Sequence, residues 1–108
     1  MENKKINTMK IEVETMVEFE EWCSEGVDSD NKLMISKTIA TNILDNLDKE
    51  EIYIFEVLVR EENSVFDIKV VKEDFIFTLE KNLKILERFE EFELCSKVNK
   101  TINKLKNG

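Results

Sequence analysis

The chain has 108 residues, of which 42% are hydrophobic and 37% charged, and its net charge is −8. This size and composition predict a single domain over residues 9–108, with enough apolar residues for a core without metal or disulfide support, after a frayed lead at 1–8. The negative charge argues against direct binding to nucleic acid or to anionic membranes, because both need a basic surface.

The first patterned stretch follows the polar lead. Near-strict alternation of apolar and charged residues predicts a strand over 9–14 with one buried face. Thr15, followed three residues later by Glu18, fits a helix capping box and predicts a helix over 16–25. We prefer the strand followed by this helix, and one long strand over 9–20 is the alternative.

A second helix is predicted over 33–48, after a polar loop. Its apolar residues recur every four positions, at Ile35, Ile39, Ile43 and Leu47. This spacing gives a stripe of the width needed to lie on a sheet. Either Asp30 or Ser36 is expected as the N-cap, since both residue types are favoured there.

The centre of the chain predicts a β-hairpin, with strands at 52–60 and 65–72. Both runs are rich in β-branched and aromatic residues, and a polar tetrapeptide separates them. A turn centred on Glu62-Asn63 opposes Phe55 to Val70, Val57 to Ile68 and Val59 to Phe66. We expect helix 33–48 and the C-terminal helix to cover the apolar face that these pairs create.

The last third is predicted to be mainly helical. Residues 75–79 fit a short third strand, because Phe75, Phe77 and Leu79 alternate, and they fit equally the first turn of a helix capped by Asp74. Helices are predicted at 80–91 and 95–106, with a break near 91–96 where the apolar face shifts. Together the elements predict an α+β fold with a small antiparallel sheet built on the hairpin.

Several kinds of chemistry lack their usual residues. The chain has no histidine, which removes Ser-His and Cys-His nucleophile pairs and the commonest metal ligand. Gly26 and Gly108 are its only glycines, so it has no Gly-rich phosphate-binding loop. Asp28-Ser29-Asp30 opens like a calcium loop, but Lys32 stands where an oxygen ligand belongs. We therefore expect no catalytic residues, no metal site and no cofactor.

Cys23 and Cys95 are the only cysteines. Two cysteines in a domain with an adequate core are expected to be buried, reduced thiols. The N-terminal residues lack the apolar segment of a signal peptide, and no stretch is long enough to cross a membrane. We predict a cytoplasmic protein.

An acidic window without a basic residue is the strongest candidate for a working surface. Its members are Glu12, Glu14, Glu18, Glu20, Glu21, Glu25, Asp28 and Asp30. Carboxylates spaced along a strand or helix can imitate the phosphates of a nucleic acid, whereas the simpler interpretation is that they form the solvated faces of half-buried elements.

Three functional hypotheses follow. The favoured one is a non-enzymatic inhibitor that binds the basic surface of a nucleic-acid-binding or nucleic-acid-processing protein, such as a nuclease. In size, charge and missing chemistry the chain is similar to phage anti-CRISPR inhibitors and toxin-immunity proteins, although it shares no motif with them. The second is a homodimeric structural or assembly protein. An enzyme that uses paired carboxylates and a divalent ion is the least favoured.

Two aromatic positions bear on surface contacts. Trp22 is expected in the core rather than as an interface anchor. The stretch Phe75-Ile76-Phe77 is expected to leave more apolar surface exposed than any other.

Overall fold

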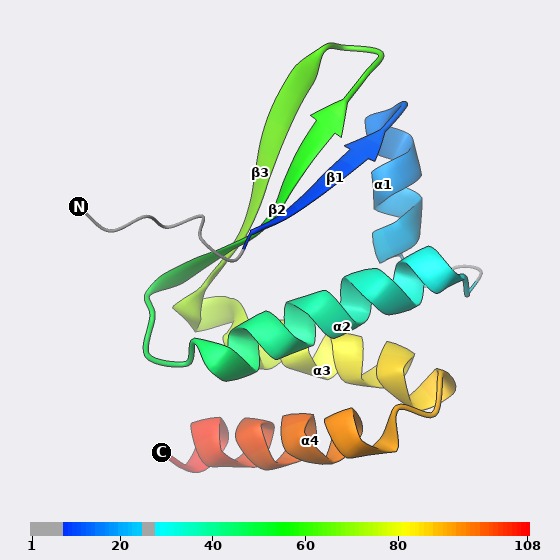
Figure 1. Ribbon diagram of the computed structural model, residues 1–108. Coiled ribbons are helices and arrows are strands. Elements are labelled where there is room, and N and C mark those ends of the chain that lie inside the picture. The colour runs from blue at the N-terminus through cyan, green and yellow to red at the C-terminus, as the bar shows by residue number, and fades with distance from the viewer. Residues whose placement is uncertain (1–7, 25–27) are drawn as a thin grey trace.

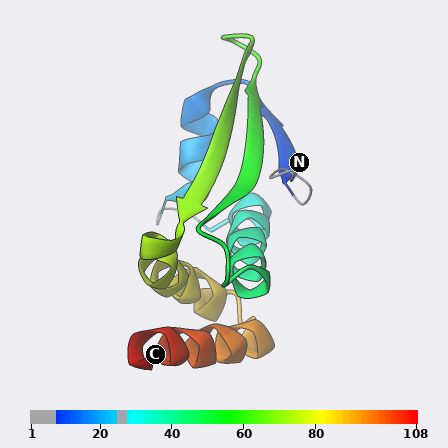
Figure 2. The same cartoon turned by 90° about the vertical axis from the view of Figure 1, so that its left-hand side faces the viewer.

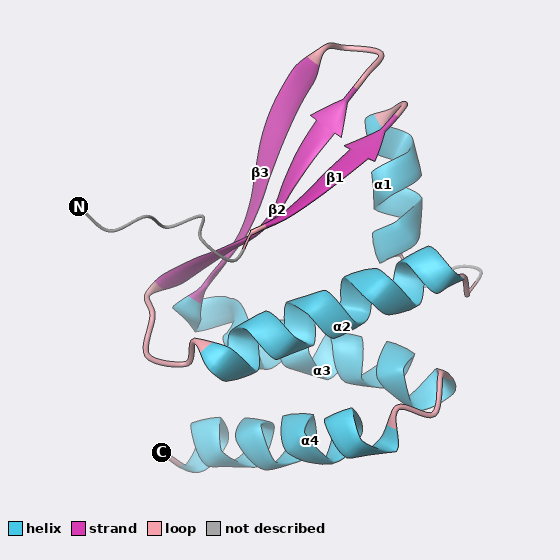
Figure 3. Cartoon of the chain, viewed as in Figure 1, coloured by secondary structure: helices cyan, strands magenta, loops and turns pink. Residues whose placement is uncertain are grey.

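The computed structural model describes residues 8–24 and 28–108 (Figures 1 and 3). Its elements are β1 (Met9–Val13), α1 (Met16–Cys23), α2 (Asp30–Asp45), β2 (Glu51–Val59), β3 (Ser64–Val71), a 3-10 turn (Lys72–Asp74), α3 (Phe75–Arg88) and α4 (Phe92–Asn107). The predicted α+β class is confirmed, including the strand near 9–14, which is followed by a helix instead of continuing to residue 20.

The three strands form one mixed sheet in the order β1-β2-β3. β2 and β3 pair antiparallel, as the predicted hairpin requires, but β1 pairs parallel with β2, from Met9 opposite Phe55 to Val13 opposite Val59. The expectation of an antiparallel sheet is therefore wrong for β1. The physical reason is the crossover connection through α1 and α2, which returns the chain to the end of the sheet where β1 begins. β2 therefore runs in the same direction as β1.

The hairpin turn lies one residue earlier than predicted. Arg60 to Asn63 form the turn, closed by a 3.1 Å hydrogen bond from the Asn63 amide to the Arg60 carbonyl. Asn63 takes a positive φ of 49°, which asparagine tolerates well. Val57 therefore faces Phe66 instead of the predicted Ile68. The shift equals two residues along β3, so from Phe55 onward it leaves the side chains of β2 on their predicted faces.

A register irregularity between Tyr53 and Phe55 reverses the burial pattern of β2. Before it, Ile52 and Ile54 are buried, and after it the buried positions are Phe55, Val57 and Val59. Alternate residues of a strand face the core, and the extra residue of such a bulge switches the core-facing set from the even-numbered to the odd-numbered positions. Ile54, predicted to lie on the mixed outer face, is therefore part of the core.

Side-chain caps start the first two helices. The Thr15 hydroxyl accepts a 3.3 Å hydrogen bond from the Glu18 amide, as the capping-box pattern predicts. For α2 both predicted caps are wrong, because Ser29 is the N-cap and accepts from the Lys32 amide at 3.2 Å. The helix thus begins three residues before position 33, and Asp30 becomes its first residue.

Residues 75–79 form the start of α3, so no strand exists there. The helix ends at Arg88, where the Glu91 amide bonds to the Leu86 carbonyl and the Glu90 amide to the Glu87 carbonyl. Glu90 has a positive φ of 58°. This is a Schellman ending with glutamate in place of the usual glycine, and it separates α3 from α4 slightly before the predicted break.

The helices lie on one side of the sheet. Phe19 of α1 packs edge-on against Phe55 of β2, with ring centroids 5.8 Å apart, and α2 also packs against β2. α4 packs on α3 and α2, so the expectation that the C-terminal helix covers the hairpin is wrong. The molecule is flat, 44 × 40 × 18 Å, with the hairpin turn at one end and α4 at the other (Figures 1 and 2).

Candidate functional site

The end of β1 meets the hairpin turn. The Arg60 amide donates to the Val13 carbonyl at 2.9 Å, and the Glu61 amide donates to the Glu14 carbonyl at 3.0 Å. These bonds continue the parallel pairing of β1 and β2 beyond the strands themselves. Acids from two distant parts of the sequence therefore become neighbours at this end of the sheet.

Arg60 binds two of the predicted site residues. Its Nε lies 2.9 Å from Glu14 Oε2, and its Nη1 lies 3.0 Å from Glu12 Oε2. The hydrogen bond that Arg60 donates to Glu14, together with the charges of both glutamates, raises the pKa of Arg60. All three side chains are exposed, so water and salt screen these ion pairs strongly.

We call this region the acidic end of the sheet. It comprises five carboxylates and one cation: Glu12, Glu14, Glu18, Glu61, Glu62 and Arg60. Glu18 joins it because α1 begins shortly after β1 and carries Glu18 in its first turn (Figure 1). With every carboxylate ionised, five negative charges and one positive charge leave a local net charge of −4.

Apolar side chains are exposed beside these charges. Val17 on the first turn of α1 is 60% exposed, and Val65, directly after the hairpin turn, is 57% exposed. Phe66 is also partly exposed, because this part of β3 extends beyond the helices that cover the sheet (Figure 2). The acidic end thus combines a concentrated negative charge with accessible apolar surface.

The remaining residues of the predicted acidic window lie elsewhere. Glu20 and Glu21 are exposed further along α1, and Asp30 is exposed at the start of α2. Glu25 lies outside the described residues. The window is therefore divided among β1, α1 and α2.

Asp28 is engaged by α3. Arg88 Nη2 lies 2.9 Å from Asp28 Oδ1, and Arg88 Nε contacts both carboxylate oxygens at 3.2 and 3.3 Å. This hydrogen bonding lowers the pKa of Asp28 below its ordinary value of 3.8. The carboxylate ties the segment before α2 to the end of α3, and so has an intramolecular role.

Sequence reasoning missed Glu61 and Glu62, because they lie outside the acidic window. The signal that would have found them is strand direction. Two predicted helices between the first strand and the hairpin form a crossover, which allows the two strands to run parallel. Parallel strands place their C-terminal ends together, and hence Glu14 beside Glu61.

Most of the basic residues of the C-terminal segment lie on α4, at the opposite end of the molecule from the hairpin turn (Figure 1). These are Lys97, Lys100, Lys104 and Lys106. Lys106 Nζ lies 3.0 Å from Glu80 Oε2 on α3. The four lysines near the C-terminus and the acidic end of the sheet therefore lie at opposite ends of the molecule.

Over residues 8–24 and 28–108, no three His, Cys, Asp or Glu side chains are grouped to hold a metal ion. Within the same residues, no helix is long and apolar enough to cross a membrane. Cys95 is buried, as predicted, whereas Cys23 is only half-buried, and both thiols are free. Trp22 is half-buried at the edge of the core.

Three comparisons found no match to the chain, whether among family models, curated proteins or solved structures.

Proposed function

We propose that the chain is a non-enzymatic protein-binding module. Its acidic end docks on the basic surface of a nucleic-acid-binding or nucleic-acid-processing protein and thereby inhibits it. The observation that carries the proposal is the meeting of β1 with the hairpin turn, where Arg60 pairs with Glu12 and Glu14 and is followed directly in the chain by Glu61 and Glu62. Such a cluster competes with nucleic-acid phosphates for lysine and arginine side chains, and it accelerates encounter with a basic partner.

The apolar residues beside the charges support a protein partner. Charged rims steer association, while the centre of a protein interface is depleted in charge and buries apolar side chains. Val17, next to Glu18 in α1, and Val65, soon after Glu62 in the chain, are exposed and offer such apolar contacts. In this arrangement the carboxylates set the association rate and its salt dependence, and the valines slow dissociation.

The test is capture of a partner from a nuclease-treated bacterial lysate at about 50 and about 500 mM NaCl, where the Debye lengths are about 14 and 4 Å. Three glutamates of the acidic end are neutralised together: Glu18→Gln, Glu61→Gln and Glu62→Gln. The matched control neutralises three exposed glutamates where α3 meets α4: Glu87→Gln, Glu90→Gln and Glu93→Gln.

We expect a nucleic-acid-binding protein to be captured at low salt and released at high salt. The acidic-end variant loses the partner, the control variant keeps it, and duplex DNA displaces the protein from it. If both triple variants lose binding equally, or if DNA fails to compete, the acidic end is not a nucleic-acid-mimicking surface.

A homodimer is the second candidate, and β3 is the observation that favours it. β3 forms one edge of the sheet and carries the exposed Val65 and Phe66. The backbone N–H and C=O groups of an edge strand can pair with a strand from a second copy, which extends the sheet. Sedimentation over a range of protein concentrations tests this: a dimer that persists at high salt and is lost in Val65→Lys supports it, whereas a monomer throughout excludes it.

A further inference from the structure

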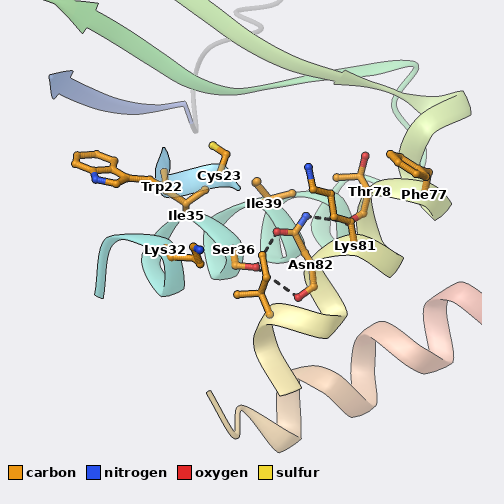
Figure 4. Close-up of a pocket in the computed structure, with 11 residues that line it drawn as sticks. Trp22, Cys23, Lys32, Ile35, Ser36, Ile39, Phe77, Thr78, Lys81 and Asn82 are labelled. Atoms are coloured by element: carbon orange, nitrogen blue, oxygen red, sulfur yellow. Dashed lines mark hydrogen bonds between the residues drawn. The ribbon is translucent and has the colours of Figure 1, made fainter. Parts of the chain in front are cut away.

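A pocket of about 150 Å³ lies between α1, α2 and α3 (Figure 4). It adjoins the last residues of α1, whereas the acidic end adjoins the first turn of that helix. Its walls are formed by Trp22, Cys23, Lys32, Ile35, Ser36, Ile39, Phe77, Thr78, Lys81, Asn82 and Ile85. Phe77 is 69% exposed, so the pocket has one wall at the molecular surface.

The charge of this lining is opposite to that of the chain. The sequence has 24 acidic and 16 basic residues, yet the pocket is lined by two lysines and by no aspartate or glutamate. The rest of the lining is mainly apolar, with isoleucines from α2 and α3 and an aromatic ring from α1. The pocket therefore suits a ligand that has one anionic group and an apolar body.

Lys32 makes this charge unusual. The residue is only 1% exposed, and its Nζ is enclosed without a hydrogen-bond partner among the described residues. An ammonium group loses its hydration when it is buried, and this is unfavourable unless an anion and hydrogen-bond acceptors replace the water. The buried ammonium of Lys32 therefore suits an anion that the described residues do not supply.

The positive charge of Lys32 helps to lower the pKa of the Asp28 carboxyl, whose ion pair is with Arg88. Burial raises the pKa of the Cys23 thiol, as does the charge of Glu20, while the charges of Lys81 and Lys32 lower it. Both lysines therefore exert their field at the same corner of the pocket.

The polar wall between the lysines is already organised. Ser36 Oγ donates to Asn82 Oδ1 at 2.7 Å, and Asn82 Nδ2 donates to the Thr78 carbonyl at 2.8 Å (Figure 4). The first bond joins α2 to α3, and the second lies within α3. Both the oxygen and the nitrogen of the Asn82 side-chain amide are therefore already hydrogen-bonded. Recognition of a charged ligand consequently falls to Lys32 and Lys81.

We propose that this pocket binds a small organic monocarboxylate, with the carboxylate paired to Lys32 and the apolar body against Ile35, Ile39 and Ile85. One buried ammonium balances one negative charge, and the flexible lysine stem lets that ammonium turn towards it. A cavity of about this volume accommodates a six-membered ring. Phosphate fits less well, because it carries more charge and needs more donors than this wall has free.

Trp22 reports on the site directly, because it lines the pocket and is the only tryptophan. The probe is cyclohexanecarboxylate, added to about 10 mM, a concentration that fills about nine-tenths of sites with a Kd of about 1 mM. Cyclohexanecarboxamide is the neutral comparison, and inorganic phosphate is the anion without an apolar body. Each titration follows Trp22 fluorescence and the melting temperature.

We expect a saturable fluorescence change and a raised melting temperature with the carboxylate, and at least tenfold weaker binding of the carboxamide and of phosphate. Lys32→Met abolishes carboxylate binding, whereas Lys84→Met, an exposed lysine outside the pocket, retains it. No saturable change in the wild type, or equal binding of the acid and the amide, overturns the proposal. This comparison uses the wild-type protein alone, so it holds even if Lys32→Met fails to fold.

Discussion

The acidic end of the sheet and the Lys32 pocket hold charge in opposite ways. At the acidic end, Arg60 pairs with Glu12 and Glu14 through exposed side chains, and each ion pair is screened. In the pocket, a single ammonium is enclosed without a partner in the described chain. The proposed actions differ accordingly: the acidic end through the sum of its charges and at a distance, and the pocket through the buried ammonium of Lys32 at contact range.

The two regions therefore differ in how strongly a single substitution affects stability. Changing one exposed glutamate alters a field that its neighbours largely maintain, so the effect on stability is small and depends on salt. Changing one buried polar group leaves its partner without water or a hydrogen bond, so the effect is large and does not depend on salt. The predictions below separate the two regions on that basis.

The largest effect is expected at the polar wall of the pocket. Asn82→Ala removes the nearer acceptor of the buried Ser36 hydroxyl, at 2.7 Å, and leaves only the backbone carbonyl of residue 82, at 3.5 Å. We expect a loss of about 2 kcal/mol in the free energy of unfolding, measured by urea denaturation. The control is Asn103→Ala on the exposed side of α4, which changes stability by less than about 0.5 kcal/mol. Equal effects at the two sites would contradict the contrast between buried and exposed positions.

The next largest effect has the opposite sign. Lys32→Met replaces a buried, unpartnered ammonium by an apolar side chain of similar length. Without added carboxylate, we expect stability to rise by about 1–2 kcal/mol in urea denaturation. Lys84→Met is the matched control and changes little, because Lys84 is exposed. A destabilised Lys32→Met protein would mean that the ammonium already has a stabilising partner.

A smaller effect is expected at the acidic end. Arg60→Gln removes the only cation among the five carboxylates and increases their repulsion. We expect the melting temperature to fall at about 20 mM NaCl and to return to the wild-type value at about 500 mM, where the Debye length falls from about 20 to about 4 Å. Thermal melts at both salt concentrations measure it, and a fall that persists at high salt would show a buried role for Arg60.

The smallest effect concerns Asp28. Arg88 lowers the pKa of this carboxyl below 3.8, so the ionised form is favoured by folding. The resulting stabilisation is fully present above pH 3.8 and is lost as the pH falls through the lower, folded-state pKa. We therefore expect Asp28→Asn to be less stable than wild type at neutral pH, with the difference vanishing in acid. A carbon-detected NMR titration of the Asp28 carboxyl measures the pKa itself, and a value at or above 3.8 would contradict the interaction.

The elements that depend on local pattern were predictable. The hairpin follows from two runs of β-branched and aromatic residues, and the cap of α1 follows from Thr15 and Glu18. The start of α3 was not, because Phe75, Phe77 and Leu79 fit both a strand and a helix. In the structure Phe75 and Leu79 are buried and Phe77 is exposed, so the four-residue spacing of the helix decides.

Features that depend on tertiary arrangement were missed. The bulge at Ile54 is a property of how β2 meets β3, and the direction of β1 depends on the path of the crossover. The same path places Glu61 beside Glu14. No local pattern in the sequence predicts this contact. The acidic character of the proposed docking surface is thus visible in the sequence, whereas the set of residues that form it is not.

The most direct test of the acidic end as a docking surface is an NMR titration of the labelled protein with an arginine-rich peptide at low salt. We expect the amide shifts to concentrate at residues 12–18 and 60–65 and to disappear in the variant that neutralises Glu18, Glu61 and Glu62. Shifts centred instead on Glu87–Glu93, or spread evenly over all exposed acids, would contradict the proposed surface.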